Sequence, residues 1–281
     1  MSSKSPDSVM VAAIQMNSQD SLTDNLAQLD KLLAEAALRG VKLAVLPENF
    51  AVFGAPGQAH TASQLPAILT WLADACRRYR LWIVAGSLPS SHRPDGEVIP
   101  DGRVRSACFI LDEEGVVQGR YDKIHLFDAE VGDRQATYRE SAVFEPGSSV
   151  VTVPTPWGRV GLTICYDLRF PELFMALRKA GTDLLVLPAA FTAITGEAHW
   201  ETLLRARAIE TQCFVIAAGQ TGKHGALRET WGHSMVINPW GKVLDERPEP
   251  TPGVVAVACD LGEMRKLRHS MPLMSHRRLS Y

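Results

Sequence analysis

Apolar and polar positions follow two different periods along the first part of the chain. Residues 9–16 form an apolar run that is typical of a buried strand. Residues 22–39 then place leucines at helical spacing, with Gly40 as the stop signal, and residues 43–46 form a second apolar run. A strand, a helix and a strand in this order predict two parallel strands in one sheet.

The same patterns continue through the rest of the chain. Helices are predicted at 65–79, 172–180 and about 199–211. Strands are predicted at 81–86, 184–187, 214–218, 233–238 and 254–260, and hairpins at 103–122 and 150–165. Surface loop is predicted at 89–102, and a long irregular stretch, of the kind that is usually functional or mobile, at 124–147.

This order of elements predicts a mixed-sheet α/β fold with the helices outside the sheets. No Pro/Ser-rich linker of domain-boundary character interrupts the chain. We therefore predict one domain over residues 1–281, with its core at about 9–261. The C-terminal tail, 262–281, is basic and is expected to begin with a short helix.

The composition is that of an ordinary globular protein, because 46% of the 281 residues are hydrophobic and 21% are charged. The formal net charge of −2 gives no reason to expect a polyanionic partner, so nucleic-acid binding is not predicted. The first residues are polar, and no apolar run approaches the length of a membrane span. Neither a signal peptide nor membrane binding is predicted, and the protein is expected to be soluble.

The five cysteines are scattered, odd in number and never arranged as C-x-x-C, which is neither a disulfide framework nor a zinc-ligand pattern. Reduced thiols favour a cytoplasmic location. The chain has no Walker A loop and no G-x-G-x-x-G segment, and His269 and His276 are too far apart for a helical metal pair. No metal and no organic cofactor is predicted.

One cysteine stands out by its place in the chain. Cys165 ends the apolar strand 160–164 and is followed by a polar turn and a predicted helix. Ligands of α/β proteins bind at the carboxyl ends of strands, where the backbone N–H of Tyr166 would be available to stabilise an oxyanion. The alternative role is that of a small buried apolar residue, which is what most free cysteines are.

Two charged residues also follow apolar strands. Glu48 comes directly after the run 43–46, where incomplete solvation would raise its pKa toward the range of a general base; a polar cap is the alternative. Lys123 closes the first hairpin, a place that usually holds a solvated lysine. His125 is of a residue type that activates thiols, but the sequence does not place its ring beside Cys165.

Three segments around these residues resemble the signature blocks of the nitrilase superfamily, the carbon–nitrogen hydrolases. They are LPENF (46–50), YDKIHLFD (121–128) and GLTICYDLRFPELF (161–174). The resemblance spans nearly the whole chain and implies an α-β-β-α sandwich with mixed sheets. The segments 188–222 and 232–244 further resemble the branch of the deaminated-glutathione amidases, whose relatives include the omega-amidases.

The resemblance also implies roles for individual residues. Cys165 would be the nucleophile, Glu48 the general base and Lys123 the cation that stabilises a tetrahedral oxyanion. Glu140 would position the substrate and support these three residues. The resemblance further implies a homodimer, paired through elements such as the predicted helix over 198–210.

The predicted reaction is hydrolysis of a small amide through a cysteine thioester. The expected substrate is deaminated glutathione, which would yield 2-oxoglutarate and cysteinylglycine; an omega-amidase acting on 2-oxoglutaramate and a carbamoylase are the alternatives. Arg169 and Phe191 are candidate substrate contacts, with a salt bridge and core packing as their alternative roles. A non-catalytic binding protein of the same fold and a serine hydrolase using Ser234 are the competing hypotheses from other classes.

Overall fold

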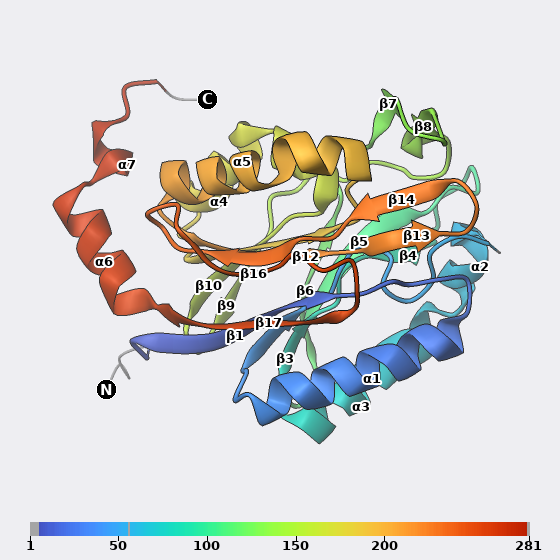
Figure 1. Ribbon diagram of the computed structural model, residues 1–281, viewed down its shortest axis with the longest axis horizontal. Coiled ribbons are helices and arrows are strands. Elements are labelled where there is room, and N and C mark those ends of the chain that lie inside the picture. Colours follow the sequence, from blue (N-terminus) through green and yellow to red (C-terminus); the bar gives the residue numbers. More distant parts are fainter. Residues whose placement is uncertain (1–5, 56, 280–281) are drawn as a thin grey trace.

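Two mixed β-sheets packed face to face form the centre of the molecule (Figure 1). The computed structural model describes residues 6–55 and 57–279. In the first sheet the strands follow the order β17-β1-β2-β3-β5-β4, with β6 beside β5. Their bounds are β1 Ser8–Gln15, β2 Leu43–Val45, β3 Trp82–Val84, β4 Leu88–Ser90, β5 Arg105–Leu111, β6 Val117–Asp122 and β17 Gly253–Asp260.

The second sheet follows the order β16-β15-β12-β11-β10-β9. Its strands are β9 Thr152–Thr155, β10 Gly158–Leu162, β11 Leu184–Ala189, β12 Phe214–Gly219, β15 Ser234–Ile237 and β16 Val243–Arg247. The central strands of each sheet run parallel, β1 to β3 in the first and β10 to β12 in the second. Parallel neighbours need a crossover, and the predicted strand–helix–strand unit at the start of the chain is confirmed.

Helices cover the outer face of each sheet, α1 and α3 on one side and α4 and α5 on the other (Figure 1). The helices are α1 Leu22–Leu38, α2 Gln58–Ser63, α3 Leu65–Tyr79, α4 Pro171–Lys179, α5 Ala193–Thr211, α6 Leu261–Ser270 and α7 Leu273–His276. Within the described part of the chain, none of them is long and apolar enough to cross a membrane. The predicted mixed-sheet α/β fold with outer helices is confirmed.

Strand β1 explains the order of the layers. Val11 faces the space between the two sheets, where Leu162 of β10 also lies. Ile14 of the same strand faces the layer of α1, together with Leu33. A strand that is covered on both faces needs apolar side chains at nearly every position, which is why residues 9–16 form a continuous apolar run.

Several elements differ from the prediction. The sequence patterns did not predict two short hairpins, nor the short elements α2, β4 and β16. The two hairpins comprise β7 Asp128–Glu130, β8 Thr137–Arg139, β13 Thr221–His224 and β14 Arg228–Trp231. Such short strands bury too few side chains to produce a clear period. Helix α5 begins at Ala193 instead of near residue 199, because the Thr192 side chain caps it by accepting a hydrogen bond from the Thr195 N–H at 3.4 Å.

Candidate active site

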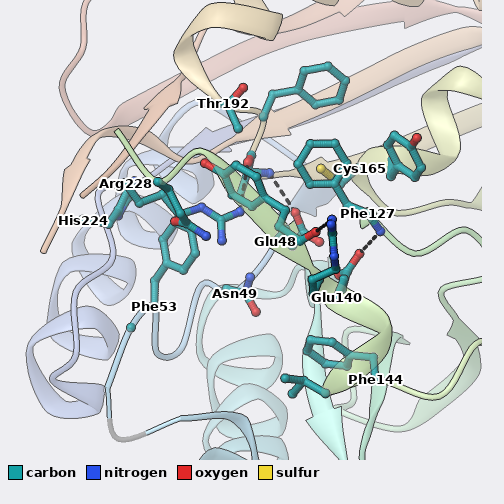
Figure 2. Close-up of a pocket in the computed structure, with 18 of the residues that line it drawn as sticks. Glu48, Asn49, Phe53, Phe127, Glu140, Phe144, Cys165, Thr192, His224 and Arg228 are labelled. Atoms are coloured by element: carbon teal, nitrogen blue, oxygen red, sulfur yellow. Dashed lines mark hydrogen bonds between the residues drawn. The ribbon is translucent and has the colours of Figure 1, made fainter. Parts of the chain in front are cut away.

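Strand ends from both sheets meet at one cavity of about 510 Å³. Glu48 follows β2, Lys123 follows β6 and Cys165 follows β10, and all three line this cavity. Glu140, at the start of the 3₁₀ helix Glu140–Ala142, lines it as well. Figure 2 shows Glu48, Glu140 and Cys165 close together in this cavity. The structure therefore brings together the residues that the resemblance singled out.

Lys123 is the centre of a buried ion-pair network. Only 2% of its surface is exposed, and its Nζ donates to Glu48 Oε1 at 2.9 Å, to Glu140 Oε1 at 2.7 Å and to Glu140 Oε2 at 2.9 Å. Glu48 Oε2 accepts a further bond from the Ala190 N–H at 2.9 Å, and Glu140 Oε2 accepts one from the Phe127 N–H at 2.5 Å. A buried ammonium is stable only when it is paired in this way, so the solvated position that a lysine usually takes is excluded here.

The backbone at Cys165 is held in a tight turn. Cys165 begins the 3₁₀ helix Cys165–Arg169 with φ at +46°, a conformation that costs a residue with a side chain about 1–3 kcal/mol. The fully buried Asp167 stabilises the turn, because its Oδ2 accepts bonds from the Ile164 N–H at 2.8 Å and the Tyr121 hydroxyl at 2.7 Å. The sulfur is thereby fixed at the cavity, with 9% of the residue exposed.

The neighbouring charges set the protonation states of the cluster. Burial by itself would raise the pKa of Glu48, but the charge and hydrogen bond of Lys123 outweigh it and hold that pKa below its ordinary value of 4.5. Burial and Lys123 act on the pKa of Glu48 in opposite directions, which the sequence left undecided, and in the folded protein the effect of Lys123 is the larger. Burial and the Glu48 carboxylate raise the pKa of the Cys165 thiol well above 9.0, although Lys123 opposes this.

The carboxylates around Lys123 raise its pKa. Burial would lower it, but the carboxylates of Glu140 and Glu48 together raise it above its ordinary value of 10.5. The resting cluster at neutral pH thus consists of an ammonium, an ionised Glu48 and a neutral thiol, whose hydrogen bond to Glu48 also favours the carboxylate. A thiol beside a carboxylate is the arrangement in which a base can remove the proton as the sulfur attacks.

Three residues proposed from the sequence form part of the cavity wall beside Cys165. The Arg169 guanidinium lies over the rings of Tyr166 and Phe191, 5.8 and 5.3 Å from their centroids, and its Nη1 is 3.3 Å from His199 Nδ1. The hydrogen-bonding partner of Arg169 is thus the His199 ring and not a carboxylate, so the alternative of a salt bridge is not supported. Phe191 both lines the cavity and packs against Trp200.

Two other candidates lie in structural positions. The His125 ring is 2.7 Å from Asp167 Oδ1 through Nδ1 and stacks on Phe170 with 3.7 Å between centroids. It is absent from the residues that line the cavity. Ser234 is fully buried and accepts a bond from the Gly219 N–H at 2.9 Å, which contradicts its role as an accessible nucleophile.

Arg228 is a cavity residue that the sequence analysis missed. It begins β14, and its guanidinium carbon lies 4.6 Å from the centroid of the Phe53 ring and 5.4 Å from that of Tyr138. All three side chains line the cavity. The signal that could have found Arg228 is the pair of glycines, Gly222 and Gly225, which marks a turn just before it.

Comparison with known proteins identifies the chain's relatives. The family model of the carbon–nitrogen hydrolases matches residues 10–269. A deaminated glutathione amidase from Yersinia enterocolitica is 41% identical over 271 residues, which is 95% of this chain and 92% of that protein. The crystal structure of Saccharomyces cerevisiae Nit3, a member of branch 10 of the nitrilase superfamily, covers 99% of this chain and 100% of its own at a TM-score of 0.85 and 27% identity.

A third relative shows chemistry at a cysteine. A mutant of the amidase from Nesterenkonia sp. AN1, 26% identical with a TM-score of 0.77, carries the acetamide moiety of fluoroacetamide covalently added at its active site cysteine. The similarity covers 98% of this chain and 99% of that one. The predicted nitrilase-like sandwich and the predicted family are both confirmed. The chain belongs to the carbon–nitrogen hydrolase family and is an amidase of the nitrilase superfamily, a hydrolase that acts on the C–N bond of amides.

Proposed function

We propose that this amidase hydrolyses deaminated glutathione to 2-oxoglutarate and cysteinylglycine. The observation that carries the proposal is a cavity whose thiol, ammonium and carboxylates lie in the same space as three arginines, of which Arg169 and Arg228, unlike Arg139, have no carboxylate partner among the described residues. This substrate has a carboxylate on each side of its scissile amide, and arginine is well suited to bind carboxylates. The name of the Yersinia enterocolitica relative supports the same substrate.

In the proposed reaction Cys165 is the nucleophile and Glu48 the general base. The thiol proton moves to Glu48 while the sulfur attacks the amide carbon. The tetrahedral intermediate collapses with cleavage of the C–N bond, and Glu48 returns the proton to the leaving amine. Water then attacks the thioester, again losing a proton to Glu48, and the acid leaves as the thiol is restored. The raised pKa of the thiol and the lowered pKa of Glu48 place the proton on sulfur before the reaction, so the transfer to Glu48 is unfavourable by itself and is coupled to formation of the C–S bond.

We propose that Lys123 stabilises the oxyanion mainly through its charge. An ammonium has three N–H groups, and its three contacts in the resting site all go to carboxylate oxygens. The backbone N–H of Tyr166 would then supply the hydrogen bond to the oxyanion. Glu140 keeps Lys123 in place and charged, because it accepts two of the three bonds and raises the pKa of the lysine.

The pH dependence of kcat/KM follows from these pKa shifts. Glu48 must be ionised to act as the base, and since its pKa is lowered, activity should be lost only as the pH falls below 4.5. The pKa values of Cys165 and Lys123 are raised above 9.0 and 10.5, so neither produces an alkaline limb below pH 9.0. Initial rates across this range, with circular dichroism as a check on folding, measure the profile. An acid limb well above pH 4.5 would contradict it.

The substrate is tested by turnover of three compounds at equal concentration. Deaminated glutathione is expected to give the highest kcat/KM, above 2-oxoglutaramate and an N-carbamoyl amino acid, because only the first has a carboxylate on both sides of the amide. Preference for 2-oxoglutaramate would make the protein an omega-amidase, and preference for the N-carbamoyl compound a carbamoylase. If none of the three compounds is hydrolysed, the result would favour the competing hypothesis of a non-catalytic binding protein.

We also propose a homodimer in the cytoplasm. Helix α5 exposes Ile194 and Ile209, 48% and 47% accessible, and Trp240 is 68% accessible; apolar groups of this kind support an association surface. All five cysteines are free thiols, which supports a reducing compartment. Analytical ultracentrifugation measures whether the species has twice the 30.8 kDa chain mass, and cell fractionation measures the location. A stable monomer or a secreted protein would contradict these proposals.

A further inference from the structure

We infer that Arg228 is a specificity-determining residue that binds an anionic group on the leaving amine, which in the proposed substrate is the glycine carboxylate of cysteinylglycine. The inference rests on the proposed function and extends it. It assigns the two sides of the substrate to two different arginines: the acyl side to Arg169 and the amine side to Arg228.

The first observation is that Arg228 has few partners of its own. Its Nη2 donates to the Ala190 carbonyl at 3.5 Å, the long end of the hydrogen-bond range. Within the described residues its buried Nε has no hydrogen-bond partner, and the acceptor of the Nη2 bond is a backbone carbonyl and not a carboxylate. The rings of Phe53 and Tyr138 pack against it. These contacts orient the guanidinium, and the one hydrogen bond that it donates leaves its other N–H groups without an acceptor within the described residues.

The second observation is that the polar side chains packed around Arg228 carry no negative charge, and that Glu48, the carboxylate on which its charge acts, is already paired with Lys123. His224 packs on Phe53 with 4.2 Å between centroids. Burial lowers the pKa of His224 to about 4, so its ring is neutral, and its two nitrogens lie 2.7 Å from the Ser18 carbonyl and from Thr230 Oγ1. The Tyr138 hydroxyl, which donates to Asp133 at 2.6 Å, is also neutral, since burial raises its pKa. A partly buried cation in this situation favours binding of an anion.

The third observation decides which side of the substrate Arg228 faces. The acyl group stays on Cys165, and Arg169 belongs to the 3₁₀ helix that begins there. The leaving nitrogen must receive its proton from Glu48, so the amine side of the substrate lies toward that carboxylate. The charge of Arg228 acts on Glu48 and contributes to its lowered pKa. In Figure 2 Arg228 lies by Phe53 and His224, and Glu48 is drawn between Arg228 and Cys165.

A polar group on the same cavity wall fits a peptide-like leaving amine. Gln58, in α2, lines the cavity, and its buried Oε1 has no hydrogen-bond donor within the described residues. A dipeptide such as cysteinylglycine carries an amide N–H that such an oxygen can accept. The ammonia released from a simple primary amide offers neither this N–H nor a carboxylate. Arg228 therefore separates amides of acidic amines from primary amides.

The test compares three substrates: deaminated glutathione, the same compound with its glycine carboxylate converted to a carboxamide, and 2-oxoglutaramate. The Arg228→Gln variant is expected to lose at least about 30-fold in kcat/KM on deaminated glutathione. The wild type should show a loss of similar size on the carboxamide, with no further loss in the variant. Turnover of 2-oxoglutaramate should stay within about 3-fold of wild type, which also shows that the variant folds.

Two matched variants sharpen the result. Arg228→Lys keeps the positive charge but cannot bind a carboxylate in the bidentate manner of a guanidinium. This variant should recover part of the loss on deaminated glutathione. Arg139→Gln removes a charge from the same cavity at a side chain that is 53% exposed and paired with Glu130, and it should keep the wild-type preference for the carboxylate over the carboxamide.

The inference and the proposed function fail in different ways. Wild-type protein that hydrolyses deaminated glutathione and its carboxamide equally well would overturn the inference alone. So would an Arg228→Gln variant that loses activity equally on all three substrates, because this would indicate a structural role. Absence of any wild-type turnover of deaminated glutathione would overturn the proposed function, and the inference with it.

Discussion

Cys165→Ala is expected to reduce kcat for deaminated glutathione by roughly 10⁴–10⁶-fold, with little change in melting temperature. The methyl group cannot form the thioester, so the two-step reaction is lost and only binding and charge stabilisation remain. Alanine occupies less space than the thiol and has the same backbone preference, so the turn at φ +46° should persist through the bonds of Asp167. Steady-state rates and thermal unfolding measure both effects.

The matched control is Cys76→Ala. Cys76 is a fully buried free thiol on α3 and plays no part in the proposed reaction. This variant should keep wild-type kcat while losing about 1 kcal/mol of unfolding free energy. Mass spectrometry of wild-type protein with a slow substrate should reveal an acyl group on the peptide that contains Cys165. Undiminished hydrolysis by the Cys165→Ala variant would contradict the thioester mechanism.

Lys123→Met is expected to damage activity and stability together. Loss of the charge at the oxyanion should lower kcat/KM by roughly 10²–10³-fold. Removing one partner of a buried ion pair costs about 3–5 kcal/mol, and here two carboxylates, Glu48 and Glu140, are left without the ammonium between them. Kinetic measurements and denaturant unfolding report the two losses separately.

The pH dependence of this variant's stability should also change sign. In the wild type the lowered pKa of Glu48 contributes stability that is present above pH 4.5 and is lost as the pH falls through the folded-state value. Without Lys123, burial dominates and raises the pKa of Glu48 above its ordinary value. The contribution of Glu48 is then largest below pH 4.5 and is lost as the pH rises, so the variant should recover stability in acid.

The Lys123→Met/Glu140→Gln double variant distinguishes charge repulsion from simple loss of packing. Removing one of the two carboxylates should restore part of the lost unfolding free energy, while activity stays low because no cation remains at the oxyanion. A Lys123→Met protein with wild-type stability, or a double variant no more stable than the single one, would contradict the network as the source of the effect.

The elements that could be predicted from the sequence are those with a strong local period. Residues 9–16 and 22–38 have it, because the strand is covered on both faces and the helix on one. The hairpin of β13 and β14 has no such period, since its strands of four residues each alternate between buried and exposed positions irregularly. That hairpin carries Arg228 into the cavity, so the omission of the hairpin from the prediction also hid the residue.

The sequence by itself determined the family, the order of the principal strands and helices, and the identity of the three residues that converge at the cavity. These follow from local patterns and from signature blocks around Glu48, Lys123 and Cys165. Only the tertiary structure decided three further features: the burial of Lys123, the downward shift in the pKa of Glu48 and the entry of Arg228 into the cavity. Each depends on charges and rings contributed by segments far apart in the chain, whose distances exist only once the two sheets have packed together.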